Sequence, residues 1–165
     1  SSNSEGKRRD KKNGQKIIMK QIRVIFGIML VFTVLINPVF AITPLDRVDI
    51  TNPRLVNAFG SKISDQINVN QQVQISADVK NNQEKSQNFY YLVQVKNQND
   101  VVVSFQWIKG ILDPGQTFNP AVSWTPKISD EYTVEIFVWD VTVNANTKSW
   151  QADALAEHVI LKITS

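Results

Sequence analysis

The chain has 165 residues, of which 42% are hydrophobic and 20% charged, and it contains no cysteine. This composition fits one globular domain, and it excludes disulfides, thiolate chemistry and cysteine-based metal sites. The net charge of +3 combines two unlike parts. Residues 1–23 carry eight basic and two acidic side chains, whereas residues 42–165 carry ten basic and thirteen acidic ones. Because the second part is mildly acidic, nucleic acid is not an expected partner.

An apolar segment follows the basic tail of residues 1–23. Residues 24–45 carry no charge, and Val24–Ile36 is an almost unbroken run of apolar side chains. A short apolar run behind basic residues is typical of a signal peptide, here with cleavage after Ala41. The alternative is a retained membrane anchor, since residues 24–45 are long enough to span the bilayer with the basic tail in the cytoplasm. Both interpretations place residues 46–165 outside the cytoplasm, as a secreted or membrane-anchored domain at the cell surface.

From residue 46 onward the hydrophobic pattern changes to a period of two, which indicates strands. Turn signals at residues 98–100, at 113–115 and over the polar stretch 140–148 separate the apolar runs. The expected strands cover residues 67–69, 73–79, 88–97, 101–108, 117–124, 131–139 and 156–164. Several short strands at this spacing predict an all-β protein, an antiparallel immunoglobulin-like β-sandwich of about seven strands preceded by one N-terminal hydrophobic helix.

Alternation within each strand assigns side chains to the core or to the outer face. Where polar residues such as Gln94 and Lys96 must face water, their neighbours must face inward. Buried aromatic residues of this kind need no functional explanation, because their burial stabilises the fold. The residues expected in the core are Phe89, Tyr91, Val93, Val95, Val103, Phe105, Trp107, Phe118, Val122, Trp124, Tyr132, Val134, Ile136 and Val138.

Three short motifs follow one another in the second half of the chain. They are Leu112–Gln116 (LDPGQ), Ala121–Pro126 (AVSWTP) and Asp130–Val134 (DEYTV). Together they resemble the L-x-P-G, W-x-P and G-x-Y-x-V signature of CARDB-like, immunoglobulin-type modules, and are similar to a domain repeated in secreted proteins of ammonia-oxidising archaea. The resemblance covers residues 65–139 and implies a fold and an adhesion or interaction role rather than an activity.

The same resemblance implies a tyrosine corner at Tyr132, whose hydroxyl would tie its strand to the preceding loop. Where the family has glycine before this tyrosine, the chain has Asp130, which tolerates a positive φ better than most residues do.

Residues suited to catalysis or metal binding are scarce. His158 is the only histidine, and one histidine without cysteine cannot form a blue-copper site. No nucleophile elbow supports a hydrolase triad. The pairs Asp46/Asp49 and Asp130/Glu131 are interpreted as solvated surface charges rather than as catalytic carboxylates or calcium ligands. We therefore expect no enzymatic activity, no catalytic or metal-binding residue, and no cofactor.

The strongest functional signal is hydrophobic. Tyr90 and Leu92 on one expected strand, and Phe137 and Trp139 on another, point away from the core. These two strands are neighbours in immunoglobulin-type sandwiches, so the four residues form a candidate interaction patch. The alternative is that residues 140–155, which include Trp150, fold back over the patch and bury it.

These observations support a non-enzymatic extracytoplasmic interaction or adhesion module at the cell surface, with a protein partner. The alternative is an accessory subunit docked on a larger membrane protein complex through its N-terminal helix and the aromatic sheet face. In that case residues 24–45 would be uncleaved and would contact the membrane. A cleaved, monomeric secreted form would favour the first hypothesis, and a retained anchor with co-purifying membrane proteins would favour the second.

Overall fold

The computed structural model describes residue 16, residues 42–144 and residues 146–165. The expected basic tail of residues 1–23 and most of the expected apolar segment of residues 24–45 lie outside the described residues, so both stay predictions. Among the described residues, no helix has the length and apolar character needed to cross a membrane. The folded unit, Ile42–Ser165, is built from strands.

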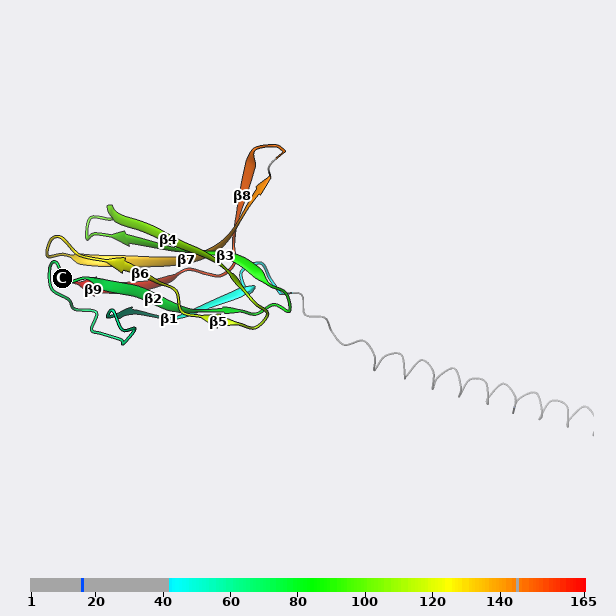
Figure 1. Cartoon of the computed structure of the whole chain (residues 1–165), viewed down its shortest axis with the longest axis horizontal. Helices are drawn as coiled ribbons and strands as arrows, with labels where there is room; N and C mark the ends of the chain where they lie inside the picture. Colours follow the sequence, from blue (N-terminus) through cyan, green and yellow to red (C-terminus); the bar gives the residue numbers. More distant parts are fainter. Residues whose placement is uncertain (1–15, 17–41, 145) are drawn as a thin grey trace, which may run out of the picture. The chain divides into compact units, whose positions relative to one another are not determined.

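The described residues of this unit form nine strands in two antiparallel sheets packed face to face (Figure 1). In the four-stranded sheet, β2 lies between β1 on one side and the short β5 and β6 on the other. Its strands are β1 (Val48–Val56), β2 (Val73–Asn81), β5 (Thr117–Phe118) and β6 (Ala121–Trp124).

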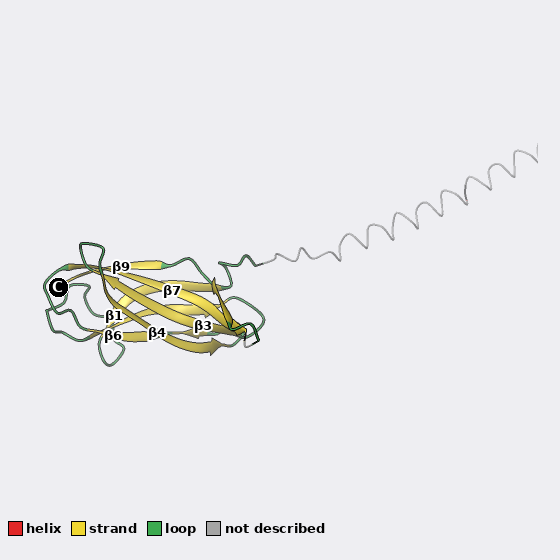
Figure 2. Ribbon diagram, turned by 90° about the horizontal axis from the view of Figure 1, so that it is seen from above, coloured by secondary structure: helices red, strands yellow, loops and turns green. Residues whose placement is uncertain are grey.

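The five-stranded sheet has the order β4–β3–β7–β8, and β9 pairs with the first half of β7. Figure 2 shows β4, β3, β7 and β9 side by side. The strands are β3 (Gln87–Lys96), β4 (Val102–Leu112), β7 (Glu131–Asn144), β8 (Ser149–Ala154) and β9 (Val159–Thr164). The expected antiparallel β-sandwich of immunoglobulin type is confirmed.

The core lies between the two sheets and is built by alternate residues of β2, β3 and β7. On β3, the expected core residues Phe89, Tyr91, Val93 and Val95 are each at most 2% exposed. Burying each such side chain stabilises the fold by roughly 1.5–3 kcal/mol. The four expected core residues of β7 are likewise buried, as are Val122 and Trp124 of β6.

The tyrosine corner expected at Tyr132 is confirmed. The Tyr132 hydroxyl donates a hydrogen bond to the Ile128 carbonyl at 2.8 Å. Asp130, which stands where the family has glycine, does not take a positive φ, so the tolerance of aspartate for that conformation is not used. Instead, the backbone amide and carbonyl of Asp130 both bond to Ser165 at 3.0 Å, and its carboxylate accepts a bond from the Glu131 amide at 2.8 Å. These bonds hold the corner without a left-handed residue.

Strand β4 presents to the core the set of alternate residues that was expected on its outer face. Val103, Phe105 and Trp107 were expected in the core, but they lie on the outer face and are 49%, 51% and 58% exposed. The reason is the register with β3, which places Phe89 opposite Gly110. A Cβ atom at position 110 would come within 3.0 Å of the Phe89 ring, so the missing side chain leaves room for that ring.

The inward positions of β4 include a polar residue because β4 is the last strand of its sheet. Gln106 faces inward at the open side of the sandwich, where its amide donates a hydrogen bond to the Ser123 carbonyl of β6 at 2.8 Å. This bond satisfies the amide and joins the two sheets at their rim.

Other departures from the expected strands have local causes. Phe118 lies opposite Val79, on the core side of β2, but is 41% exposed because β5 is short and at the edge of its sheet. The expected strand over residues 117–124 is split at Asn119–Pro120, since proline has no N–H to donate to a ladder. Residues 67–69 form no strand. Strand β1 was not expected, because a bulge at Asn52, which has a φ of 52°, interrupts its alternation.

Candidate interaction surface

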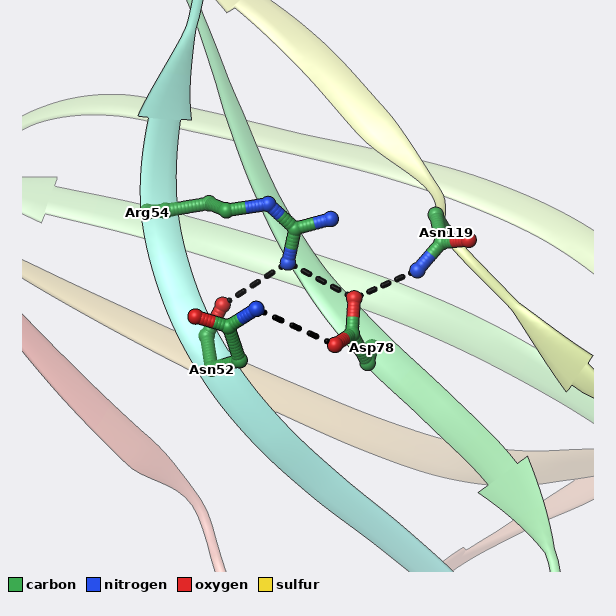
Figure 3. Close-up of polar contacts among 4 residues, drawn as sticks. All are labelled: Asn52, Arg54, Asp78 and Asn119. Carbon is green, nitrogen blue, oxygen red and sulfur yellow. Dashed lines mark hydrogen bonds and ion pairs between the residues drawn. The ribbon is translucent and has the colours of Figure 1, made fainter. Parts of the chain in front are cut away.

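The two outer faces of the sandwich differ in chemistry. On the four-stranded sheet, Asp78 of β2 accepts hydrogen bonds from Arg54 at 2.6 Å, from Asn52 at 3.2 Å and from Asn119 (Figure 3). Burial alone would raise the pKa of Asp78, but these bonds and the Arg54 charge outweigh it and hold the pKa below its usual value. The cluster ties the bulge of β1 to β2 and to the segment after β5, which is a structural role.

The outer face of the five-stranded sheet carries the four residues of the predicted patch. The register places Tyr90 opposite Trp139 and Leu92 opposite Phe137, so β3 and β7 bring all four together on one face. The rings of Phe137 and Trp139 lie edge to face, with centroids 6.0 Å apart. Each of the four side chains is half-buried by its neighbours.

Strand β4 extends this surface with two more exposed aromatic residues. Trp107 lies opposite Leu92, Phe105 lies opposite Gln94, and the two rings are 6.2 Å apart. Sequence reasoning missed both residues because it placed them in the core. The signal that could have found them was Leu112, which is buried. If Leu112 faces inward, alternation along the strand makes Phe105 and Trp107 face outward. We call the six residues the outer apolar face: Tyr90, Leu92, Phe105, Trp107, Phe137 and Trp139.

Polar residues border the outer apolar face along β3 and β7. Glu135 accepts a hydrogen bond from Gln94 at 2.8 Å and forms an ion pair with Lys96 at 2.9 Å. The Lys96 hydrogen bond lowers the pKa of Glu135, against the opposing effect of burial. His158 is exposed, and its ring stacks on Phe137 at 5.3 Å. The aromatic surface therefore ends at a border of paired polar groups.

The described residues between 140 and 154 form a hairpin that projects from the sandwich. The second half of β7 pairs with β8, from Trp139 opposite Ala154 to Asn144 opposite Ser149. The hairpin rises on the side of the five-stranded sheet, away from β1, β2 and β5 (Figure 1). Trp150, which the alternative interpretation placed over the patch, is 73% exposed. We call the hairpin formed by residues 140–144 and 149–154 the arm.

The arm has one apolar side, which continues the outer apolar face along β7. Cross-strand pairing places Val141 opposite Ala152 and Val143 opposite Trp150 on the same side of β7 as Phe137 and Trp139. Val143 is also 73% exposed. Sequence reasoning read this segment as a polar turn, although its period-two alternation was a usable signal for a hairpin.

The root of the arm is held to the sandwich by hydrogen bonds. Gln87 donates to the Asp140 carboxylate at 3.0 Å, and Arg47 donates to the Ala154 carbonyl at 3.1 Å. Directly after β8, Leu155 is fully buried, and its amide bonds to the Val138 carbonyl at 2.9 Å. These contacts fix the direction in which the arm leaves the sheet.

The described carboxylates and the histidine do not assemble a chemical site. Within residues 42–144 and 146–165, no group of three or more histidine, aspartate or glutamate side chains is placed to hold a metal ion. Asp46 accepts a hydrogen bond from the Thr43 hydroxyl at 2.5 Å, and Asp130 bonds to backbone. What the arrangement offers is a contact surface made of the outer apolar face and the arm.

Comparisons with known proteins bear on both the family and the fold. The model of a family described as S-layer A-like matches residues 25–146. The C-terminal domain of wzt superposes with a TM-score of 0.53 over 72% of this chain and 74% of that one, at 13% identity, which is a likeness of fold. A CARDB domain from Pyrococcus furiosus, solved in complex with di-metal ions, is 14% identical over 78% of this chain and 97% of that one, with a TM-score of 0.44. No curated protein matches the chain in sequence at a significant level.

Proposed function

The chain belongs to the S-layer A-like family, and from this membership we propose that it is a non-enzymatic, extracytoplasmic interaction module at the cell surface. Its contact surface is the outer face of the five-stranded sheet, with a protein as partner. The family description supports a place in or near a surface layer. The basic tail and apolar run of residues 1–45 support the same location, because both interpretations of that segment export the domain.

The single observation that carries the proposal is the exposure of Phe105 and Trp107 beside the half-buried patch. Aromatic residues are enriched at the centres of protein interfaces, where they supply large contact area. The largest exposed apolar patch of a soluble protein is often a binding site. The outer face of the four-stranded sheet, by contrast, carries the polar cluster around Asp78.

Site-specific photo-cross-linking in cells that produce the protein would test this function. A photoreactive phenylalanine analogue replaces Phe105 in one variant and Phe59 in the control. Phe59 lies in the loop between β1 and β2 and is 92% exposed, so the control is the same residue type at a more open position. We expect a protein adduct from position 105 and little or none from position 59. Equal adducts from both positions, or none from position 105, would contradict the proposed contact surface.

One observation favours the accessory-subunit alternative. Ile42, which is the first residue of the folded unit and lies within the expected apolar segment, lines a surface hollow with Leu45, Arg47 and Ala154 at the root of the arm. In an anchored protein, the chain would enter the folded domain at Ile42, which lies beside the root of the arm. The intact mass of the native protein distinguishes the two candidates, since a retained segment together with an adduct to a membrane protein selects the accessory subunit.

A further inference from the structure

The outer apolar face and the arm form the two walls of a corner. On β7, Phe137 and Trp139 belong to the sheet, and Val141 and Val143 continue the same side of the strand into the arm. Because the arm rises on this side of the five-stranded sheet (Figure 1), the inside of the corner receives apolar side chains from both walls, together with the exposed Lys109 of β4, which lies opposite Tyr90. The polar side of the arm, with Thr142, Gln151 and Asp153, points away from it.

The apolar surface inside the corner has the size of one half of a stable interface. Phe105 and Trp107 on the sheet are 51% and 58% exposed, and Val143 and Trp150 on the arm are 73% exposed. Taking the usual areas of such side chains, these four residues leave roughly 500 Å² of apolar surface in solvent, and the half-buried neighbours raise this to roughly 700 Å². Specific interfaces bury about 800 Å² on each partner.

The corner is wide enough along the arm to be considered as a site for the arm of a second copy. A twofold axis would place the arms of two copies side by side and antiparallel, with their apolar sides in contact. Each arm has five residues of β7 beyond the sheet, or about 16 Å at the usual rise per residue. The two antiparallel arms have the same length. The tip of each arm therefore lies at the root of the other arm, where it reaches the sheet of the other copy. Trp150 of one copy then meets the outer apolar face of the other.

We propose that a second copy of this chain occupies the corner, so that the protein forms a twofold dimer in which each arm fills the corner of the other copy. The proposal rests on the proposed function and names the partner of the same surface. A symmetric contact of this kind is isologous, so one apolar patch on the chain supplies both halves of the interface. It covers Val143 and Trp150 of both copies together with both outer apolar faces.

Sedimentation equilibrium of the full chain in a density-matched detergent is the first test. The unaltered chain should have twice its monomer mass, and Trp150→Ser should shift the equilibrium to monomer. Gln151→Ser, on the polar side of the same strand, is the matched control and should leave the dimer intact. A monomeric unaltered chain, or a Trp150→Ser variant that stays dimeric, would overturn the proposal.

Cysteine cross-linking tests the placement of the arms, and it does not depend on a variant that weakens association. The natural chain has no cysteine, so Ala152→Cys supplies one thiol on the apolar side of the arm, and Gln151→Cys supplies one on the polar side. Mild oxidation should link two copies through position 152 in much higher yield than through position 151. Equal yields, or a higher yield at 151, would show that the arms do not pack as proposed.

The two proposals fail in distinguishable ways. If the chain is monomeric while position 105 still forms an adduct with a different protein, the dimer is wrong and the interaction surface stands. If position 105 forms no adduct in cells and the chain is monomeric, both are wrong. An adduct with twice the chain mass, together with a dimer that depends on Trp150, supports both.

Discussion

The sequence pattern places both Trp107 and Trp124 in the core, but their replacement by alanine should lower the free energy of unfolding by very different amounts. Trp124 of β6 is 7% exposed, and its ring packs edge-on against Tyr132 with centroids 4.8 Å apart. A tryptophan buries roughly 200 Å², which at about 25 cal/mol per Å² corresponds to about 5 kcal/mol. Trp124→Ala should therefore lower the free energy of unfolding by about 4–5 kcal/mol, within the range of large aromatic truncations in packed cores.

Trp107→Ala is the matched comparison on the outer apolar face. The Trp107 side chain is 58% exposed, so less than half of its surface is buried in the folded chain. Its removal opens no internal cavity, and we expect a loss of only about 1–2 kcal/mol. The difference between the two variants reports which face of β4 and which face of β6 points into the core.

Urea unfolding of the full chain, followed by far-ultraviolet circular dichroism, measures both losses. All three proteins should be compared at one low protein concentration, so that association contributes little to the midpoint. A change in midpoint at constant slope then reports stability. Equal losses for the two variants, or a larger loss for Trp107→Ala, would refute the assignment of faces.

Three further changes test single interactions. Tyr132→Phe removes the bond to the Ile128 carbonyl and should lower the free energy of unfolding by about 1 kcal/mol. No change in the urea midpoint would show that this bond does not stabilise the tyrosine corner. The Tyr91 hydroxyl is buried without a hydrogen-bond partner among the described residues, and burial raises its pKa, so Tyr91→Phe should be neutral or stabilising by up to about 1 kcal/mol; a clear loss of stability would indicate a partner for the hydroxyl. Asp78 has a lowered pKa when folded, so its charge stabilises the fold above the usual aspartate pKa and stops doing so as the pH falls through the folded-state value. The stability of Asp78→Asn should therefore depend less on pH between about 5 and 2, and parallel profiles for the two proteins would contradict this.

The sequence predicts the faces of interior strands well. On β3 and β7, polar residues such as Gln94 and Glu135 mark one face, and the register confirms that the intervening residues are in the core. Each of these strands has a neighbour on both sides, so burial decides which residues face inward. The same reasoning identified Tyr90, Leu92, Phe137 and Trp139 as one outward group.

Edge strand β4 was assigned the wrong face because its polar residues were taken to face water, which put the apolar residues between them in the core. The bulky residues Phe105 and Trp107 lie outside, while Gln106 and Gly110 lie inside. A glycine that accommodates the Phe89 ring, and a glutamine that bonds across the rim, are specific to the contacts of this fold. Alternation alone does not contain that information, since both phases of β4 offer apolar side chains.

The arm was missed for a different reason. Its alternating residues predict strands, but Asp140, Asn144 and Lys148 made the segment resemble a turn. A hairpin that leaves the sandwich has no core of its own to bury, so its apolar side gives no indication of where it packs. The exposed Val143 and Trp150 could be placed only once the pairing of β7 with β8 was known.

Cysteine labelling on intact producing cells would test both the location of the domain and the covering of its outer apolar face. Phe59→Cys and Phe105→Cys each supply one thiol in a chain that otherwise has none, at positions that are 92% and 51% exposed in the isolated chain. A membrane-impermeant maleimide is added, and each rate is expressed relative to the rate of the same thiol in the unfolded chain. We predict rapid labelling at position 59 and strong protection at position 105. Labelling at 59 only after lysis would contradict the surface location, and labelling at 105 in proportion to its exposure would contradict a partner on the five-stranded sheet.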